Sequence, residues 1–223
     1  MRAWPTLGSK DKAGKPPIGA AWIVFRAALR DTWQDLLTTG MVNMSWLLLN
    51  VLVVTGPPAT LALFYTTNRV ARGEAVGPSD FFRVLPRYFG LAWRWGALQI
   101  VALALLTGDI YLSGRLGGDS LLGRLAQGFY VGALAIWVLF QLYVLPFLFE
   151  QQEPVLRHAL GNGLRMMSTN PVFSIVLGVL VLVALFVGTV LFLLSVAAGG
   201  FLVALVGNHA VLDRLQAAKE ETP

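Results

Sequence analysis

One uninterrupted stretch constrains this chain more than any other feature, because no charged residue lies between Trp46 and Asn68. The hydrocarbon core of a bilayer is about 30 Å thick, and a helix needs roughly 20 apolar residues to cross it. The run Leu36–Val54 supplies 19 residues before the sequence Thr55-Gly56-Pro57-Pro58 interrupts it. The sequence therefore predicts membrane-spanning helices on either side of this interruption.

Thr55, Gly56, Pro57 and Pro58 favour a change of chain direction. Proline lacks a backbone N–H and holds φ near −65°, which suits the first turn of a new helix. Glycine has no Cβ and allows a sharp turn. The motif is compatible with a kink in one long helix or with the tip of a helical hairpin.

Composition supports a membrane protein. Apolar residues make up 56% of the 223 residues and charged residues only 13%, a balance typical of polytopic membrane proteins. The chain has no cysteine, which excludes disulfides, thiolate catalysis and cysteine-based zinc sites. We interpret the net charge of +5 as the basic excess of cytoplasmic loops and not as a sign of nucleic-acid binding.

The predicted fold is all-α and polytopic, with about six transmembrane helices, amphipathic cytoplasmic elbows and both termini inside. A basic tail is expected over residues 1–17, a transmembrane domain over 38–214 and a charged tail over 215–223, with a hydrophilic loop at Gly108–Arg124. Gly73 is a plausible helix C-cap before the first elbow. The predicted spans lie near residues 36–54, 57–72, 90–108, 125–149, 172–193 and 198–212.

The distribution of lysine and arginine favours the hairpin over the kink, because these residues concentrate on the cytoplasmic side. With a hairpin, only Arg115 and Arg124 lie outside, and Arg94 lies near the inner end of a span, where its side chain can reach the interface. The other fourteen lie inside. They are Arg2, Lys10, Lys12, Lys15, Arg26, Arg30, Arg69, Arg72, Arg83, Arg87, Arg157, Arg165, Arg214 and Lys219.

Residues 18–37 predict an amphipathic interfacial helix. Apolar and aromatic residues recur there at spacings of three or four and so share one helical face. Arginine and aspartate residues, including Asp31, fall largely elsewhere. We expect the aromatic face to lie at the lipid headgroups, and a partner-binding helix is the alternative. The face comprises Trp22, Phe25, Leu29, Trp33 and Leu36.

Two further patterns concern the packing of the spans. Glu74-Ala75-Val76 and Glu153-Pro154-Val155 lie 79 residues apart, and Leu85 and Leu164 share that offset. They predict a parallel repeat of span, elbow and span. Gly128 and Gly132 form a GxxxG pair, which permits close helix approach.

Polar residues within the apolar runs are candidates for a site, because they are costly in lipid. Asn50, Gln99 and Gln141 lie inside predicted spans, with Thr55 and Glu150 near span ends. They could form hydrogen bonds between helices or line a shared polar pocket. No acidic residue is expected at mid-depth, which argues against a proton- or sodium-coupled transporter.

No catalytic constellation is visible. The two histidines are His158, expected to face solvent or headgroups, and His209, interpreted as a helix-end residue. A proton-handling pair of His209 with Asp213 is the alternative for the second. Two isolated histidines without cysteine do not make a zinc site. We therefore expect no catalytic residue, no metal and no cofactor.

The clearest charged surface follows Asn68. Its basic residues could set orientation and contact anionic lipid, or they could form a docking face for a partner. In the second interpretation, Glu74 and Asp80 fix the elbow by local pairing. The candidate docking residues are Arg69, Arg72, Glu74, Asp80, Phe81, Phe82, Arg83 and Arg87.

The segment from residue 45 to residue 90 carries a recognisable pattern: Asn50, then Val53-Val54-Thr55-Gly56-Pro57-Pro58-Ala59-Thr60-Leu61-Ala62-Leu63-Phe64-Tyr65, then Arg72-Gly73-Glu74 and Asp80-Phe81-Phe82. It resembles the YesL-like family of small bacterial integral membrane proteins, whose signature reads roughly N-x-x-x-x-P-V-V-T-x-G-P-A-x-x-A-L-Y-Y, then R-G-E, then D-F-F. This chain departs from the signature at Leu52, where the family often has proline, and at the additional Pro58.

The resemblance implies a context but no mechanism. The family has no assigned biochemical activity, and its members tend to be encoded beside carbohydrate uptake and degradation systems, including sugar ABC transporters. We therefore expect a non-enzymatic accessory or regulatory protein of the bacterial cytoplasmic membrane. Its expected partners are anionic lipid, an ABC-type sugar permease or a second copy, and not nucleic acid. A small transporter or channel is the alternative, whereas an intramembrane enzyme lacks an acid–base constellation.

Overall fold

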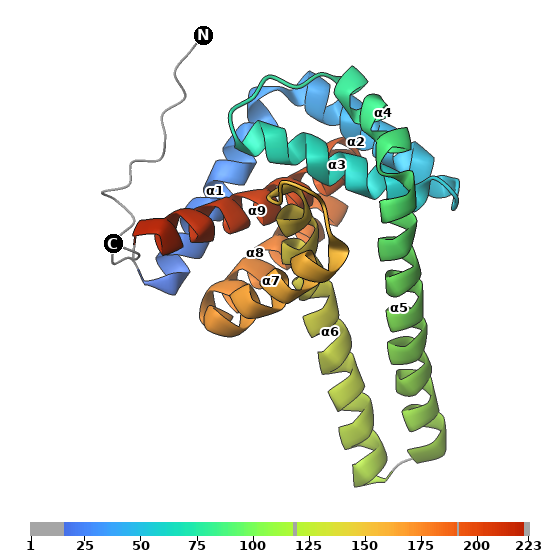
Figure 1. Cartoon of the computed structure of the whole chain (residues 1–223). Helices are drawn as coiled ribbons and strands as arrows, with labels where there is room; N and C mark the ends of the chain where they lie inside the picture. The colour runs from blue at the N-terminus through green and yellow to red at the C-terminus, as the bar shows by residue number, and fades with distance from the viewer. Residues whose placement is uncertain (1–15, 118–119, 191, 221–223) are drawn as a thin grey trace.

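The computed structural model describes residues 16–117, 120–190 and 192–220. Over these residues the chain is all-α and forms nine helices (Figure 1). Of the predicted tail over residues 1–17, residues 1–15 lie outside the described part, as do the last three residues of the chain, and Pro17 already begins the first helix. The helices are α1 (Pro17–Gln34), α2 (Leu36–Val51), α3 (Gly56–Ala71), α4 (Pro78–Arg87), α5 (Phe89–Gly117), α6 (Leu121–Phe149), α7 (Leu156–Thr169), α8 (Pro171–Val190) and α9 (Phe192–Glu220).

Helix α9 is the centre of the bundle, because it packs against α1, α2, α3, α6 and α8. Ala204, Leu205 and Val206 are fully buried in the apolar core that these helices share. The expected charged tail after residue 215 differs from the structure. Helix α9 continues to Glu220, since charged residues are compatible with a helix whose exposed side they occupy.

The chain reverses between α2 and α3, and the tip of this hairpin is the connection Leu52–Thr55. Of the four predicted turn residues, Thr55 lies in the connection, whereas Gly56, Pro57 and Pro58 form the first turn of α3. The Trp46 indole N–H donates to Thr60 Oγ1 at 3.2 Å, which requires α2 and α3 to lie side by side. Thr55 closes the turn by donating its hydroxyl to the Leu49 carbonyl at 2.6 Å. The Trp93 indole of α5 donates to the Val54 carbonyl at 3.1 Å and holds the tip.

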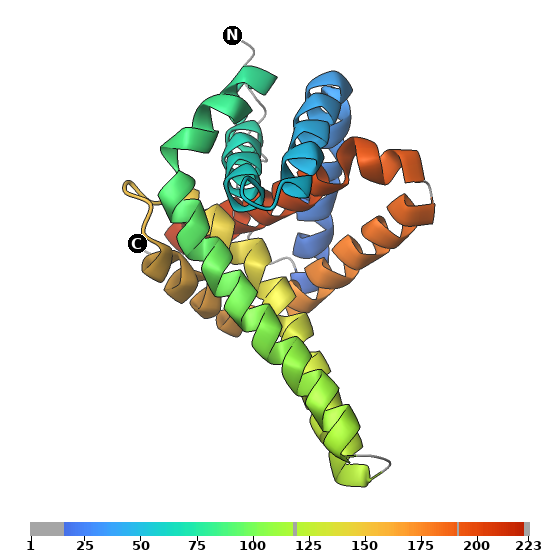
Figure 2. The same cartoon turned by 90° about the vertical axis from the view of Figure 1, so that its right-hand side faces the viewer.

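Helices α5 and α6 form a long hairpin that projects from the bundle (Figures 1 and 2). The predicted hydrophilic loop over residues 108–124 is wrong for most of its length. Helix α5 continues to Gly117, and α6 begins at Leu121 with the Ser120 hydroxyl accepting a hydrogen bond from the Gly123 N–H at 3.1 Å. The polar residues there are compatible with helix: Arg115, for example, donates to the Tyr111 hydroxyl one turn away at 3.0 Å.

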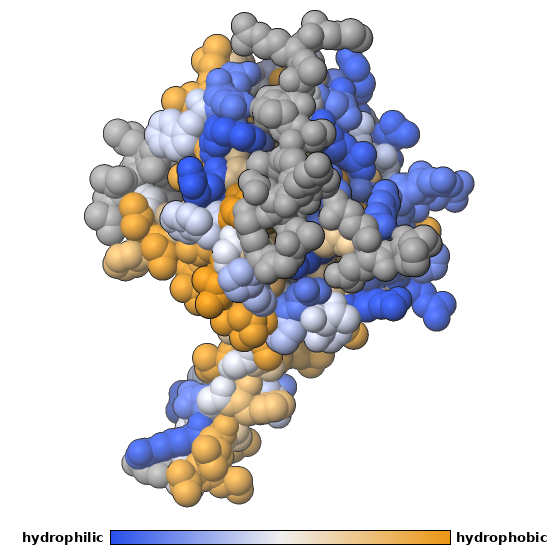
Figure 3. All heavy atoms as spheres, turned by 90° about the vertical axis from the view of Figure 1, so that its left-hand side faces the viewer, coloured by the Kyte–Doolittle hydropathy of each residue, from blue (hydrophilic) through white to orange (hydrophobic). Residues whose placement is uncertain are grey.

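The composition of the helices is that of a membrane protein. Among the described residues, α5, α6 and Pro171–Thr189 of α8 are long and apolar enough to cross a bilayer, while Leu36–Val51 is a shorter apolar helix. Figure 3 shows hydrophobic residues over much of the projecting hairpin, with hydrophilic residues near its tip and over the opposite part of the molecule.

The six-span count and the inside position of both termini remain predictions. In Figure 1, α2 and α3 run across the direction of α5. Spanning helices usually tilt by no more than about 40° from the bilayer normal. At 16 residues each, α2 and α3 are about 24 Å long, which is short of a full crossing.

Two short elbow helices, α4 and α7, connect longer helices in the same way. Helix α4 packs on the preceding α3, and α7 packs on the preceding α6; each elbow then leads into a long apolar helix. The order of helix, elbow and long apolar helix therefore occurs twice, as α3-α4-α5 and α6-α7-α8. The repeat of membrane spans expected from the 79-residue offset stays a prediction.

The first helix differs from its prediction as a purely interfacial element. Helix α1 packs against α8 and α9, and it buries small residues such as Ala21 and Ala28 together with Asp31. The predicted aromatic face points outward at Trp22 and Trp33, which are each 48% exposed, whereas Phe25 is buried. A helix with one face in the core and aromatic residues outside is suited to the edge of a membrane-embedded bundle.

The predicted close contact at Gly128 and Gly132 is not formed, because a Cβ on either residue would meet nothing within 4 Å. Close approach occurs at other glycines. A Cβ at Gly207 of α9 would lie 2.5 Å from the Leu142 carbonyl oxygen of α6. A GxxxG pair permits a contact, but the rest of the bundle decides which glycines face a neighbour.

Candidate functional site

Ion pairs hold the elbow between α3 and α4 together. Arg69 Nε donates to Glu74 Oε2 at 2.7 Å, and Arg69 Nη1 lies 3.4 Å from Asp80 Oδ1. Arg83 Nη1 lies 3.8 Å from the same Asp80 oxygen. Gly73, with φ of 78°, ends α3 in the left-handed region that glycine adopts easily, which confirms its predicted capping role.

Asp80 also fixes the start of α4. The Gly77 N–H donates to Asp80 Oδ2 at 3.0 Å, as in one half of a capping box. This backbone hydrogen bond is the main reason that the pKa of Asp80 lies below its usual value, and Arg69 and Arg83 lower that pKa further. Asp80 is therefore charged at neutral pH, and the predicted pairing of Glu74 and Asp80 within the elbow is formed.

The candidate docking residues separate into four groups, of which Arg69, Glu74 and Asp80 are the ion-paired group described above. Phe81 is fully buried, so it anchors α4 to the core and is closed to a partner. Phe82 is 49% exposed, the Arg83 side chain is 80% exposed, and Arg87 is exposed beside the Tyr88 ring at 5.4 Å. Arg72 belongs to a different cluster, described below.

The three candidate pocket residues do not meet. The Gln99 side-chain amide donates to Gln141 Oε1 at 2.8 Å, and the Trp137 indole N–H donates to Gln99 Oε1 at 2.9 Å. These contacts join α5 to α6. Asn50 is exposed and donates to the Trp46 carbonyl one turn earlier on its own helix at 2.8 Å. Gln99 and Gln141 therefore act as an interhelical hydrogen-bonded pair, without Asn50.

A buried polar cluster joins α3, α9 and the end of α6. The Asn68 side chain donates to Glu150 Oε1 at 2.8 Å and lies within hydrogen-bonding distance of Asn208 Oδ1 at 3.0 Å. Arg72 Nη2 pairs with Glu150 Oε2 at 2.7 Å. Asn208 in turn donates to Thr67 Oγ1 at 3.0 Å. From the sequence, Glu150 was a candidate polar residue near a span end and Arg72 a candidate docking residue, but their contact was not predicted.

The histidine next to this cluster has a partner that the sequence did not indicate. His209 Nε2 lies 2.7 Å from Asp31 Oδ2, and both side chains are at most 10% exposed. The alternative pairing of His209 with Asp213 is wrong: Asp213 lies against Arg214 at 3.0 Å. Asp31 was assigned from the sequence to the polar side of an interfacial helix. Asp31 lies one turn after Ala28, on the helix face that carries small residues, and this position is the signal that could have located Asp31 in the core.

The described residues contain no group of three or more histidine, cysteine, aspartate or glutamate side chains arranged to hold a metal ion. Asp31 and His209 are hydrogen-bonded to each other, and the polar cluster beside them is satisfied by its own members. Both arrangements join helices that are distant in sequence. His158, expected to face solvent or headgroups, is exposed on α7.

Comparisons with protein-family models, with curated proteins and with solved structures give no match for this chain. The resemblance of residues 45–90 to the YesL-like family therefore stays a prediction. The structure by itself defines the class as an all-α protein with apolar helices of membrane-spanning length.

Proposed function

We propose that this protein is a non-enzymatic accessory protein of the bacterial cytoplasmic membrane that binds a partner through the outer face of α4. The observation that carries the proposal is that one face of α4 is buried in the bundle whereas its opposite face is exposed. Its inner face is buried at Phe81 and Val84, and its ion pairs fix its position, while Phe82, Arg83 and Arg87 stay exposed.

The chemistry of this face favours an acidic protein segment as the occupant. An exposed aromatic ring beside two arginines combines the residue types that most often dominate binding energy at interfaces. Asp80, the only acid on α4, already lies against Arg69 and Arg83. The exposed charge on the helix is thus positive and complements an acidic loop of a neighbouring membrane protein. The resemblance adds a carbohydrate ABC permease as the specific partner to test.

The polar residues support this proposal over the transporter alternative. A substrate pathway lined by Asn50, Gln99 and Gln141 requires the three to share one cavity. Gln99 and Gln141 are instead bonded to each other and to tryptophans, and Asn50 is bonded to its own helix.

Affinity copurification from native membranes tests the docking face. Arg83→Glu together with Arg87→Glu is expected to reduce recovery of the partner by about tenfold or more, because placing like charges at an interface costs several kcal/mol. Arg115→Glu with Arg124→Glu changes the net charge equally at the far tip of the α5–α6 hairpin and is expected to leave recovery unchanged. Equal recovery from both double variants would contradict the docking face.

The inside position of the elbow can be tested separately, because the chain has no cysteine of its own. Ser79→Cys places a thiol at the exposed start of α4. Membrane-impermeant maleimide is expected to label it only after the cells are opened, since the arginine-rich elbow should lie in the cytoplasm. Labelling of intact cells would place the elbow outside and overturn the predicted orientation.

A further inference from the structure

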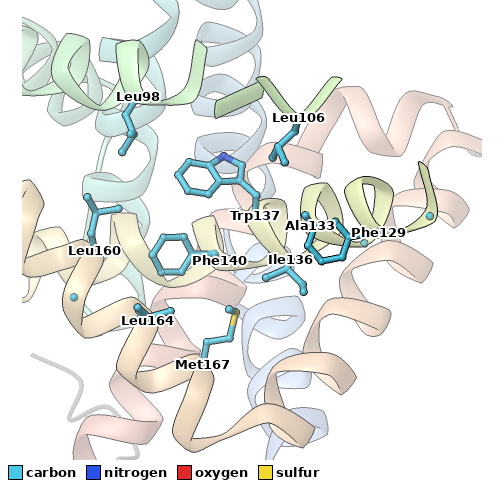
Figure 4. Close-up of a pocket in the computed structure, with 13 residues that line it drawn as sticks. Leu98, Leu106, Phe129, Ala133, Ile136, Trp137, Phe140, Leu160, Leu164 and Met167 are labelled. Atoms are coloured by element: carbon cyan, nitrogen blue, oxygen red, sulfur yellow. The ribbon is translucent and has the colours of Figure 1, made fainter. Parts of the chain in front are cut away.

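A cavity of about 890 Å³ lies between α5, α6 and α7, away from the α4 face (Figure 4). Leu98 and Leu106 of α5 form one wall, Phe129 and Phe140 lie along α6, and Leu160 of α7 closes one end. The volume falls in the range of about 300–1,000 Å³ that is typical of small-molecule sites.

The walls are apolar and lined partly by glycine. Gly128, Gly132 and Gly161 all border the cavity, and a Cβ on any of them would meet nothing within 4 Å. The one indole N–H in the lining, that of Trp137, already donates to Gln99. An occupant therefore contacts α6 through hydrocarbon and finds no hydrogen-bonding partner there.

Arginines flank this apolar cavity at the end formed by α7. Arg157 and Arg165 lie one helical turn before and after Gly161, so they share its exposed stripe. Arg94 of α5 lies one turn before the lining residue Leu98 and is also exposed. Among the described residues, none of these three guanidinium groups has an ion-pair partner.

Acidic residues do not neutralise this end of the cavity. The first acid along α5 is Asp109, beyond Leu106, and neither α6 nor α7 contains an acid. Glu150, in the connection from α6 to α7, is bonded to Arg72 and Asn68. Glu153 is exposed in the same connection. The cavity is thus apolar along α6 and positively charged beside α7.

We propose that this cavity binds one anionic phospholipid, with the phosphate between Arg94, Arg157 and Arg165 and the acyl chains along Gly128 and Gly132. Basic pockets between membrane helices on the cytoplasmic side are suited to anionic headgroups. Phe140 lies against Gly163 of α7, and from Phe140 back to Gly132 the apolar surface of α6 leads away from α7. Acyl chains along this surface continue into the bilayer. The proposal does not depend on the docking function of α4.

Lipid titration followed by native mass spectrometry tests the site on the purified full-length protein. Phosphatidylglycerol is expected to bind with a stoichiometry of one and more tightly than phosphatidylcholine with the same acyl chains. Arg157→Gln with Arg165→Gln should weaken phosphatidylglycerol binding on the order of thirtyfold and leave phosphatidylcholine binding unchanged. Arg115→Gln with Arg124→Gln, at the tip of the α5–α6 hairpin, is the matched control and should bind as the unmodified protein does.

Gly132→Leu fills the cavity and is expected to abolish binding of both lipids, whereas Gly108→Leu, at another open helical glycine, should not. Equal binding of the two lipids by the unmodified protein overturns the proposal, and this comparison requires no variant to fold. A dimer that Gly132→Leu dissociates, in protein that retains no lipid, would identify a second copy as the occupant and also overturn it.

Discussion

Asp31→Ala is expected to destabilise the protein by about 3–5 kcal/mol, because it removes one member of a buried pair and leaves the other without its partner. Asp31 contacts His209 at 2.7 Å and Arg30 at 3.1 Å, and its side chain is 2% exposed. The loss should appear as a lower midpoint in denaturant unfolding in detergent micelles. It is also expected to loosen the packing of α1 on α9, since this pair joins the two helices.

Two comparisons isolate the buried pair from the loss of an acid in general. Glu153→Ala removes an exposed carboxylate and should change stability by no more than about 0.5 kcal/mol. The double variant of Asp31→Ala with His209→Ala should lose less than the sum of the single variants, because residues in contact are coupled. Additive losses would show that the two side chains do not stabilise each other.

Gly207→Ala is expected to destabilise the protein by about 1–3 kcal/mol, the usual cost of overpacking a core. The added Cβ would lie 2.5 Å from the Leu142 carbonyl oxygen and 3.2 Å from Pro146 Cγ. A backbone carbonyl cannot rotate away as a side chain does, so α9 has to move away from α6. Thermal unfolding followed by circular dichroism measures the effect.

Gly108→Ala is the matched control, because it makes the same change in α5 where a Cβ meets nothing within 4 Å. Alanine is favoured over glycine inside a helix by about 0.5–1 kcal/mol, so this variant is expected to be slightly more stable. If both variants shift stability in the same direction by the same amount, helix propensity and not the contact between α9 and α6 governs the result.

The long apolar stretches and the turns could be predicted from the sequence because both depend on local chemistry. Gly56 and the paired prolines predicted the interruption between α2 and α3, the distribution of lysine and arginine favoured a hairpin there, and Gly73 predicted the end of α3. Glu74 and Asp80 lie close to Arg69 in the sequence, and this proximity predicted the local ion pairing that holds the elbow. In each case the residues that decide the structure are close together in the chain.

Prediction from local sequence failed where a segment distant in the chain determines the contacts of a helix. Gly128 and Gly132 have the right spacing for a helix contact, yet they border an open cavity, while Gly207 makes the close approach. The hydrophilic residues from 108 to 117 were assigned to a loop, but a helix accommodates them on its exposed faces. The spacing of residues shows which contacts a helix face permits, and the position of the neighbouring helix determines whether those contacts form.

Taken by itself, the sequence determined that this chain is helical, apolar enough for a membrane, and interrupted near Gly56-Pro57-Pro58, since backbone geometry and residue hydrophobicity act over a few residues. The packing of α2 beside α3 decided that this interruption is a reversal and not a kink. Only the tertiary structure decided which polar groups are buried together. Asp31 and His209 lie 178 residues apart, and Asn68 and Asn208 lie 140 apart. Burial of a polar side chain is favourable only when a hydrogen-bonding partner is buried beside it. The packing of α9 against α1 and α3 places these partners together.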